Sequence, residues 1–190
     1  MLAIWKFELS DYDPSWPARY RAEISELERL LPMVLASEHV GSTSIHPMAA
    51  MSTIDILAGV GKLNEVTDAV IESLIAAGWE HRPDIDAMIP NRRFFHRPPG
   101  PEHRTTRTHH LHVVEHGSPE WRDPILFRDF LGQHPETAQE YAELKRSLAS
   151  RGYTNPSDYS AHKADFVAGF KAGDPIANSH AWETVARWGS

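Results

Sequence analysis

The sequence contains no cysteine, which excludes a disulfide framework, a thiolate nucleophile and a cysteine-based zinc finger. It also lacks any apolar run close to the ~20 residues that a membrane-spanning helix requires. The first residues, MLAIWKFELSDYD, combine a short apolar run with charges and have no small-residue cleavage site, unlike a signal peptide. We therefore expect a soluble, cytoplasmic protein with no membrane partner.

Basic charge is also scarce. The chain has 19 basic and 26 acidic residues, for a net charge of −7, so no global basic field would attract nucleic acid. Its 190 residues, of which 41% are hydrophobic, are enough for one substantial core. We expect one domain over residues 1–190 and a small molecule as its partner.

Apolar periodicity predicts α/β organisation in the first half of the chain. Apolar side chains recur every three or four residues from Ser15 to Leu31, as in a helix. A helix is also predicted over Asn64–Ala77, with Asn64 as its cap, Ile75 on its inner face and Gly78 after its end. The strands expected here are the strand end Glu38–Val40 and the buried strand Thr53–Val60.

The second half begins with strands and loops and ends in helices. The region from Trp79 to Val114 reads as strands and loops, and Pro98–Thr106 as a mobile segment or lid. A strand is expected over Thr108–Glu115, followed by Ser118 as a helix cap. The helices predicted after it are Glu120–Leu131, Pro135–Ser150 and Ser157–Lys171.

Asp55 is the only charged side chain between His46 and Lys62, and it lies among apolar residues of a strand. A carboxylate in a buried strand loses its hydration, so it needs a metal ion, a cation or several hydrogen-bond donors to stay ionised. Asp55 is therefore a candidate for catalysis or for binding a metal ion. The alternative is that it caps the turn formed by residues 41–44.

That turn, Gly41-Ser42-Thr43-Ser44, offers backbone N–H groups and hydroxyls at what reads as a helix start. Such a geometry receives an anion well. Gly41, Ser42 and Ser44 are therefore candidate substrate-binding residues, unless the turn is an ordinary Ser/Thr cap.

Histidines and arginines mark two other predicted strands. Because side chains alternate along a strand, His110 and His112 share one face, and His109 lies on the other. His110 and His112 could act in acid–base catalysis, ligate a metal ion, or form structural hydrogen bonds. By the same rule, only one of Arg92 and Arg93 can face a ligand as an anion clamp.

The order of the motifs resembles the GrpB-like branch of the nucleotidyltransferase fold. The resemblance covers nearly all of the chain, and its motifs are YDPSW at Tyr12–Trp16, EHVGSTSI, IDIL, RTHHLHVVEHGSPEW and the set Tyr159, Ser160, Lys163 and Phe166. It implies a mixed β-sheet flanked by helices, with a helical carboxy-terminal third and the Asp55 and histidine strands side by side. It also places Lys145, Tyr159 and Lys163 over the open side of the sheet, where they would bind substrate or form a solvated face.

Two positions depart from the family pattern. The lysine expected before the Asp55 strand is Met51, which removes a phosphate-binding ammonium group. The second carboxylate of a two-metal site is absent, because the residue two places after Asp55 is Leu57.

Three functions follow as hypotheses. The first is an enzyme acting on a phosphorylated or carboxylated small molecule, with nucleotidyl transfer and Mg²⁺ or Mn²⁺ at Asp55 as the activity that the resemblance implies. The second is acid–base chemistry without metal or nucleotide, such as a cyclase, hydratase or isomerase reaction that uses Asp55, His110 and His112. The third is a noncatalytic ligand-binding module.

Overall fold

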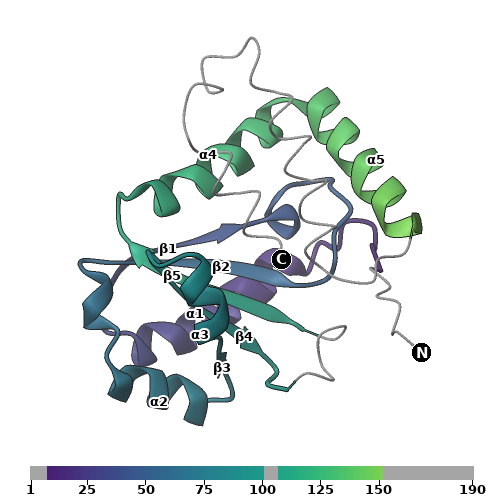
Figure 1. The fold of residues 1–190 in the computed structure, drawn as a ribbon. Helices are drawn as coiled ribbons and strands as arrows, with labels where there is room; N and C mark the ends of the chain where they lie inside the picture. Colours follow the sequence, from purple (N-terminus) through teal and green to yellow (C-terminus); the bar gives the residue numbers. More distant parts are fainter. Residues whose placement is uncertain (1–7, 101–106, 152–190) are drawn as a thin grey trace.

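A five-stranded mixed sheet organises the chain in the computed structural model, which describes residues 8–100 and 107–151 (Figure 1). The strand order is β1-β2-β5-β4-β3. β2 and β5 run parallel, whereas the pairs β1–β2, β4–β5 and β3–β4 are antiparallel. The strands are β1 (Val34–Val40), β2 (Ile54–Val60), β3 (Glu80–His81), β4 (Arg92–Arg97) and β5 (His109–Glu115).

Helices cover both faces of this sheet. Figure 1 shows α1 and α2 on one side, and α4 with α5 on the other. The α-helices are α1 (Trp16–Leu30), α2 (Asp68–Ala76), α3 (Pro83–Met88), α4 (Pro119–Gln133) and α5 (Pro135–Arg151), and the 3₁₀ turns are η1 (Ser42–Ser44) and η2 (Leu63–Glu65). This mixed sheet with flanking helices confirms the predicted fold class. The predicted helix Ser157–Lys171 lies outside the described residues.

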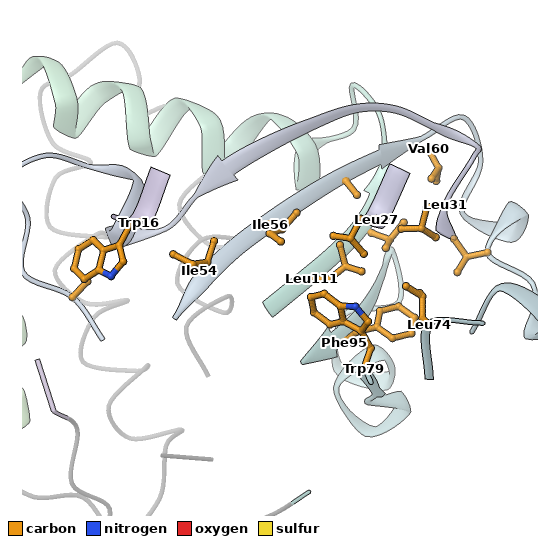
Figure 2. Packing of buried hydrophobic residues seen from close by; sticks show 14 residues of the cluster. Trp16, Leu27, Leu31, Ile54, Ile56, Val60, Leu74, Trp79, Phe95 and Leu111 are labelled. Atoms are coloured by element: carbon orange, nitrogen blue, oxygen red, sulfur yellow. The ribbon is translucent and has the colours of Figure 1, made fainter. Parts of the chain in front are cut away.

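The face toward α1 and α2 carries the main apolar core (Figure 2). Ile54 and Ile56 of β2 and Leu111 of β5 are fully buried, and they pack with Trp16 and Leu27 of α1. Burying a large aliphatic side chain contributes about 1.5–3 kcal/mol. The strands that carry the candidate site are therefore held from behind by a continuous apolar layer.

The opposite face is apolar only in part. Val40, Leu57 and Val114 pack against Trp121 of α4 in a small cluster. At the other end of the same face, the inward positions are polar: they are occupied by Asp55 in β2 and by His110 in β5. Asp55 and His110 thus lie near the end at which β2 and β5 both begin.

The predicted helix over residues 64–77 is wrong at its start. The α-helix α2 begins at Asp68 with Thr67 as its cap, and Asn64 instead lies in the 3₁₀ turn η2. Carboxylates hold that turn, because Glu65 accepts from the backbone N–H of Lys62 and Glu115 accepts from that of Leu63. The contact from Glu115, which is distant in sequence, explains why local pattern alone misplaced the boundary.

Three other details differ from the sequence prediction. Ile75, expected on the inner face of α2, is 50% exposed. Consecutive side chains of a helix point in different directions, and the neighbouring Leu74 is the one that faces the core. The first strand, of which only the end at Glu38–Val40 was predicted, starts at Val34. The short helix α3 lies in a region that was expected to hold only strands and loops.

Two local signals agree with expectation. Ser118 caps α4, since its hydroxyl accepts the backbone N–H of Trp121 at 3.3 Å. Gly78 follows α2 with φ 89°, a left-handed conformation that suits glycine. Among the described residues, no helix combines the length and the apolarity needed to cross a membrane.

Adjacent positions on α2 test the assignment of the core. Leu74→Ala removes a fully buried side chain and should lower the free energy of unfolding by about 2–5 kcal/mol. Ile75→Ala removes a half-exposed side chain and should cost less than about 1 kcal/mol. Urea denaturation measures both values, and equal losses would contradict the orientation of α2.

Candidate functional site

The strand register brings Asp55 and His110 together. They are direct partners in the parallel pairing of β2 and β5, and His112 lies two residues further along the same face. On the other side of β5, Phe94 of β4 pairs with His112. Two residues before Phe94, Arg92 lies on that face as well. Three neighbouring strands therefore contribute to one polar cluster.

Asp55 and His110 form a carboxylate–imidazole pair. Nδ1 of His110 lies 3.0 Å from Oδ1 of Asp55, so the ring N–H donates to the carboxylate. The side chains of Asp55 and His110 keep exposed fractions of 24% and 18%, so both are only partly buried. Nε2 of His110 is covered from solvent and has no hydrogen-bond partner in the described part of the chain.

His112 is fully buried and has a different partner. Its Nδ1 lies 3.1 Å from Nη1 of Arg92, and its Nε2 lies 3.8 Å from Oδ1 of Asp55. Burial, with the positive charge of Arg92, lowers the pKa of His112 to about 3. The imidazole is therefore neutral in the folded protein at physiological pH.

The carboxylate of Asp55 stays ionised despite its surroundings. Burial by itself would raise its pKa, but hydrogen bonding and attraction from His110 and His112 outweigh that effect and lower the pKa below its usual range. Asp55 is thus a permanent negative charge in the cluster at any pH near neutrality. A carboxylate with so low a pKa is a weak base.

The Gly41–Ser44 turn closes against this carboxylate. Gly41 has φ 71°, and a Cβ built there would overlap Oδ2 of Asp55. Ser44 donates to the carbonyl of Gly41 at 2.6 Å, and Thr43 donates to the carbonyl of Thr53 at 3.2 Å. Both of these hydroxyl protons are used inside the protein, which leaves Ser42 as the hydroxyl of the turn that is available to a ligand.

Ser42 is held by a lysine from the distant helix α5. Nζ of Lys145 donates to Oγ of Ser42 at 2.9 Å and to the carbonyl of Ala49 at 2.6 Å, and it lies 4.9 Å from the ring centre of Tyr141. Because Oγ of Ser42 accepts from the ammonium group, its own O–H points elsewhere. Within the described residues, that O–H donates to no partner.

The arginine pair divides as alternation predicts. Arg92 is buried on the face of the cluster, whereas Arg93 bonds the carbonyl of Pro90 and lies 4.0 Å from Asp86. Of the candidates named from the sequence, the structure brings seven together in this region: Gly41, Ser42, Asp55, Arg92, His110, His112 and Lys145. Ser44 is bonded inside the turn. Tyr159, Lys163 and most of the 98–106 loop lie outside the described residues.

Phe94 was not singled out from the sequence, although it shapes the site. Its ring centre lies 5.2 Å from that of His110 and 5.0 Å from that of His112. It is also 5.2 Å from the guanidinium carbon of Arg92. The available signal was its position two residues after Arg92, which places both on one face of a strand.

The donor set suits a hard divalent cation poorly. One ligand atom each from Asp55, His110 and His112 lies within 4.8 Å of the others, which is a geometry that could hold a metal ion. Mg²⁺ and Mn²⁺ prefer oxygen ligands, however, and this set offers one carboxylate and two imidazoles. The carboxylate oxygen nearest to the rings also already accepts from His110.

Comparison with known proteins gives a consistent group of relatives. The family described as GrpB protein matches residues 6–172. Glutamate-rich protein GrpB of Alkalihalophilus pseudofirmus is 34% identical over 88% of this chain and 96% of its own. YqkA of Bacillus subtilis is 34% identical over 85% of the chain, which spans only 45% of that longer protein. The crystal structure of conserved protein GrpB from Enterococcus faecalis is similar with a TM-score of 0.74, at 26% identity, over 94% of this chain and 99% of that one.

Gly41 and Gly117 provide a matched test of the contact between the turn and Asp55. Both have positive φ, at 71° and 78°, but a Cβ at Gly117 meets nothing within 4 Å. Gly117→Ala should cost about 1 kcal/mol from backbone strain alone. Gly41→Ala should cost about 1–3 kcal/mol more, because its ψ of −176° lies in a region that only glycine occupies readily and because its methyl group displaces the carboxylate. Equal losses of unfolding free energy in urea would show that the turn does not close on Asp55.

Buried neutral histidines predict acid sensitivity. Burial lowers the pKa of His39 to about 4, from an unfolded value of about 6.5. Below pH 6.5 the unfolded chain therefore binds more protons at this site than the folded protein, so stability falls as the pH decreases toward 4. His39→Gln should reduce the slope of unfolding free energy against pH by roughly 1 kcal/mol per unit between pH 6 and 5. An unchanged slope in urea titrations at each pH would contradict a neutral His39.

Proposed function

The chain belongs to the GrpB family, and from its site we propose that it catalyses acid–base chemistry on a small molecule carrying a carboxylate or phosphate group. His110 is the general base, Asp55 orients it, and Ser42 with Lys145 receives the anionic group. The observation that carries the proposal is the hydrogen bond between Nδ1 of His110 and Asp55, which leaves Nε2 as the basic atom.

The tautomer of His110 supports its role as the base. Because Nδ1–H donates to Asp55 at 3.0 Å, the neutral ring carries its lone pair on Nε2. That nitrogen has no hydrogen-bond partner in the described residues, so no protein donor there engages its lone pair; because the atom is covered from solvent, a substrate would have to displace the atoms that cover it. An imidazole held in one tautomer by a carboxylate is the arrangement that general-base catalysis requires.

Asp55 then acts through His110 rather than on the substrate. Its lowered pKa makes it a poor proton acceptor, but its fixed negative charge stabilises the imidazolium that forms when His110 takes a proton. Replacing this charge with a neutral amide would remove the stabilisation and change the preferred tautomer of His110. The carboxylate is therefore the orienting member of the pair.

Ser42 and Lys145 supply the binding of the anionic group. The ammonium group holds Oγ of Ser42 at 2.9 Å and directs the hydroxyl proton away from itself. A positive charge together with a directed O–H suits a carboxylate or phosphate oxygen. Ser42 directly follows Gly41, which abuts Asp55, so the anion would be bound beside the base. Proton abstraction next to such a group is compatible with cyclase, hydratase or isomerase chemistry.

Metal-dependent phosphoryl or nucleotidyl transfer is the second candidate. The clustering of Asp55, His110 and His112 within 4.8 Å favours it, as does the nucleotidyltransferase-like arrangement of the Gly41-Ser42 turn and Asp55. The single carboxylate and Met51 in place of a lysine weigh against it. A noncatalytic ligand-binding module would use the same residues and show binding without turnover.

The proposal is tested by turnover without metal. In the presence of EDTA, wild-type protein should convert at least one member of a panel of small carboxylates and phosphate esters, followed by ¹H NMR in D₂O. His110→Gln should lower kcat by about 10²–10⁴-fold and leave KM within a few-fold, because it removes the base but not the anion subsite. Lys145→Met should instead raise KM.

Two control variants sharpen this test. His109→Gln alters a histidine on the same strand but on the opposite face, and Lys62→Met removes an exposed lysine, so both should leave kcat and KM unchanged. Nucleotide binding that requires Mg²⁺ or Mn²⁺ and is lost in Asp55→Ala, measured by calorimetry, would favour the metal-dependent candidate. Binding of panel members without turnover would favour the module.

A further inference from the structure

We infer that Arg92 is a positioning residue that fixes the tautomer of His112 and withdraws this imidazole from metal coordination. The cluster of Asp55, His110 and His112 is then a proton-handling group, although its spacing resembles that of a metal centre. The consequence for catalysis rests on the proposed acid–base function, whereas the tautomer and the metal affinity do not depend on it.

The tautomer follows from donor and acceptor chemistry. A guanidinium group has only N–H donors and stays protonated in proteins. Nη1 of Arg92 lies 3.1 Å from Nδ1 of His112, so Nδ1 must accept with its lone pair. A neutral imidazole with an accepting Nδ1 carries its proton on Nε2, which is the ring nitrogen nearer to Asp55.

This tautomer is the wrong one for a metal ligand. A metal ion binds a neutral histidine through a ring lone pair, and the other ring nitrogen then carries the proton. Coordination through Nε2 would place an N–H at Nδ1, directly against the N–H of Arg92. Coordination through Nδ1 would require Arg92 to leave its position 3.1 Å away.

Packing and charge oppose either rearrangement. Arg92 is 2% exposed and His112 is 1% exposed, and the ring of Phe94 lies against both. Moving the guanidinium would leave a buried polar ring nitrogen without its donor, which is unfavourable. The positive charge of Arg92 also repels a cation placed beside His112, and burial weakens screening by solvent.

The fixed tautomer explains how Asp55 is held. Nε2–H of His112 faces Oδ1 of Asp55 at 3.8 Å, while Nδ1–H of His110 donates to the same oxygen at 3.0 Å. Two imidazole N–H groups therefore face one oxygen of Asp55. Of the two rings, only His110 retains an accepting nitrogen, Nε2, that is not directed at a protein donor in the described residues.

Histidine ¹⁵N NMR tests the tautomer directly. In wild-type protein between pH 5.5 and 8, His112 should show a pyridine-type Nδ1 and a protonated Nε2. Arg93→Met should keep this pattern because Arg93 lies on the other face. Arg92→Met should shift His112 toward the Nδ1–H form. A protonated Nδ1 in the wild type would overturn the inference, even if Arg92→Met does not fold.

Zinc titration tests the consequence for metal binding. In wild-type protein, His112→Gln should leave the Zn²⁺ affinity measured by calorimetry unchanged, because His112 is not a ligand. Arg92→Met should raise that affinity by about tenfold or more, and adding His112→Gln to it should reverse the gain. A wild-type affinity that falls at least tenfold or so in His112→Gln would show that the cluster is a metal centre and would overturn the inference.

Discussion

The burial of the Asp55 carboxylate in the sheet is the constraint on which the site depends. A charge placed in a strand loses hydration, and hydrogen-bond donors must replace that hydration if it is to remain ionised. Here two histidines of the adjacent parallel strand provide N–H groups on one side, and Gly41 leaves space on the other. Arg92 on the next strand then fixes the orientation of His112. The histidines thus meet the need of Asp55 for donors, and Arg92 in turn meets the need of His112 for a donor at Nδ1.

Much of this arrangement could be predicted because it follows from local rules. Asp55 is conspicuous as the only charge in an apolar strand, and strand alternation placed His110 with His112 and separated Arg92 from Arg93. The pairing of Asp55 with His110 needed one further step, the adjacency of two strands, which came from the resemblance to a family. Periodicity alone does not specify which strands are neighbours.

The features that local patterns could not predict depend on contacts between distant parts of the chain. Lys145 was a candidate only through the resemblance to a family, because its contact with Ser42 spans 103 residues of sequence and no pattern within α5 distinguishes a lysine that will be buried from one that will remain solvated. The start of α2 was misplaced for a similar reason, because Glu115 of a remote strand holds the turn that contains Asn64. Propensity describes what a segment prefers in isolation, whereas these positions are decided by their partners.

The same strands serve two purposes because their faces differ. On one face, Ile54, Ile56 and Leu111 pack into a dense apolar core that resists displacement. On the other face, Asp55 and His110 are held in place by that packing, although their side chains are not part of it. Their hydrogen bond of 3.0 Å is therefore maintained by the core behind the sheet. A carboxylate held in this way can keep its place in the fold while its chemical role changes. The two imidazole N–H groups that face Asp55, with an arginine behind one of them, are the reason we propose proton transfer through His110 rather than coordination of a cation.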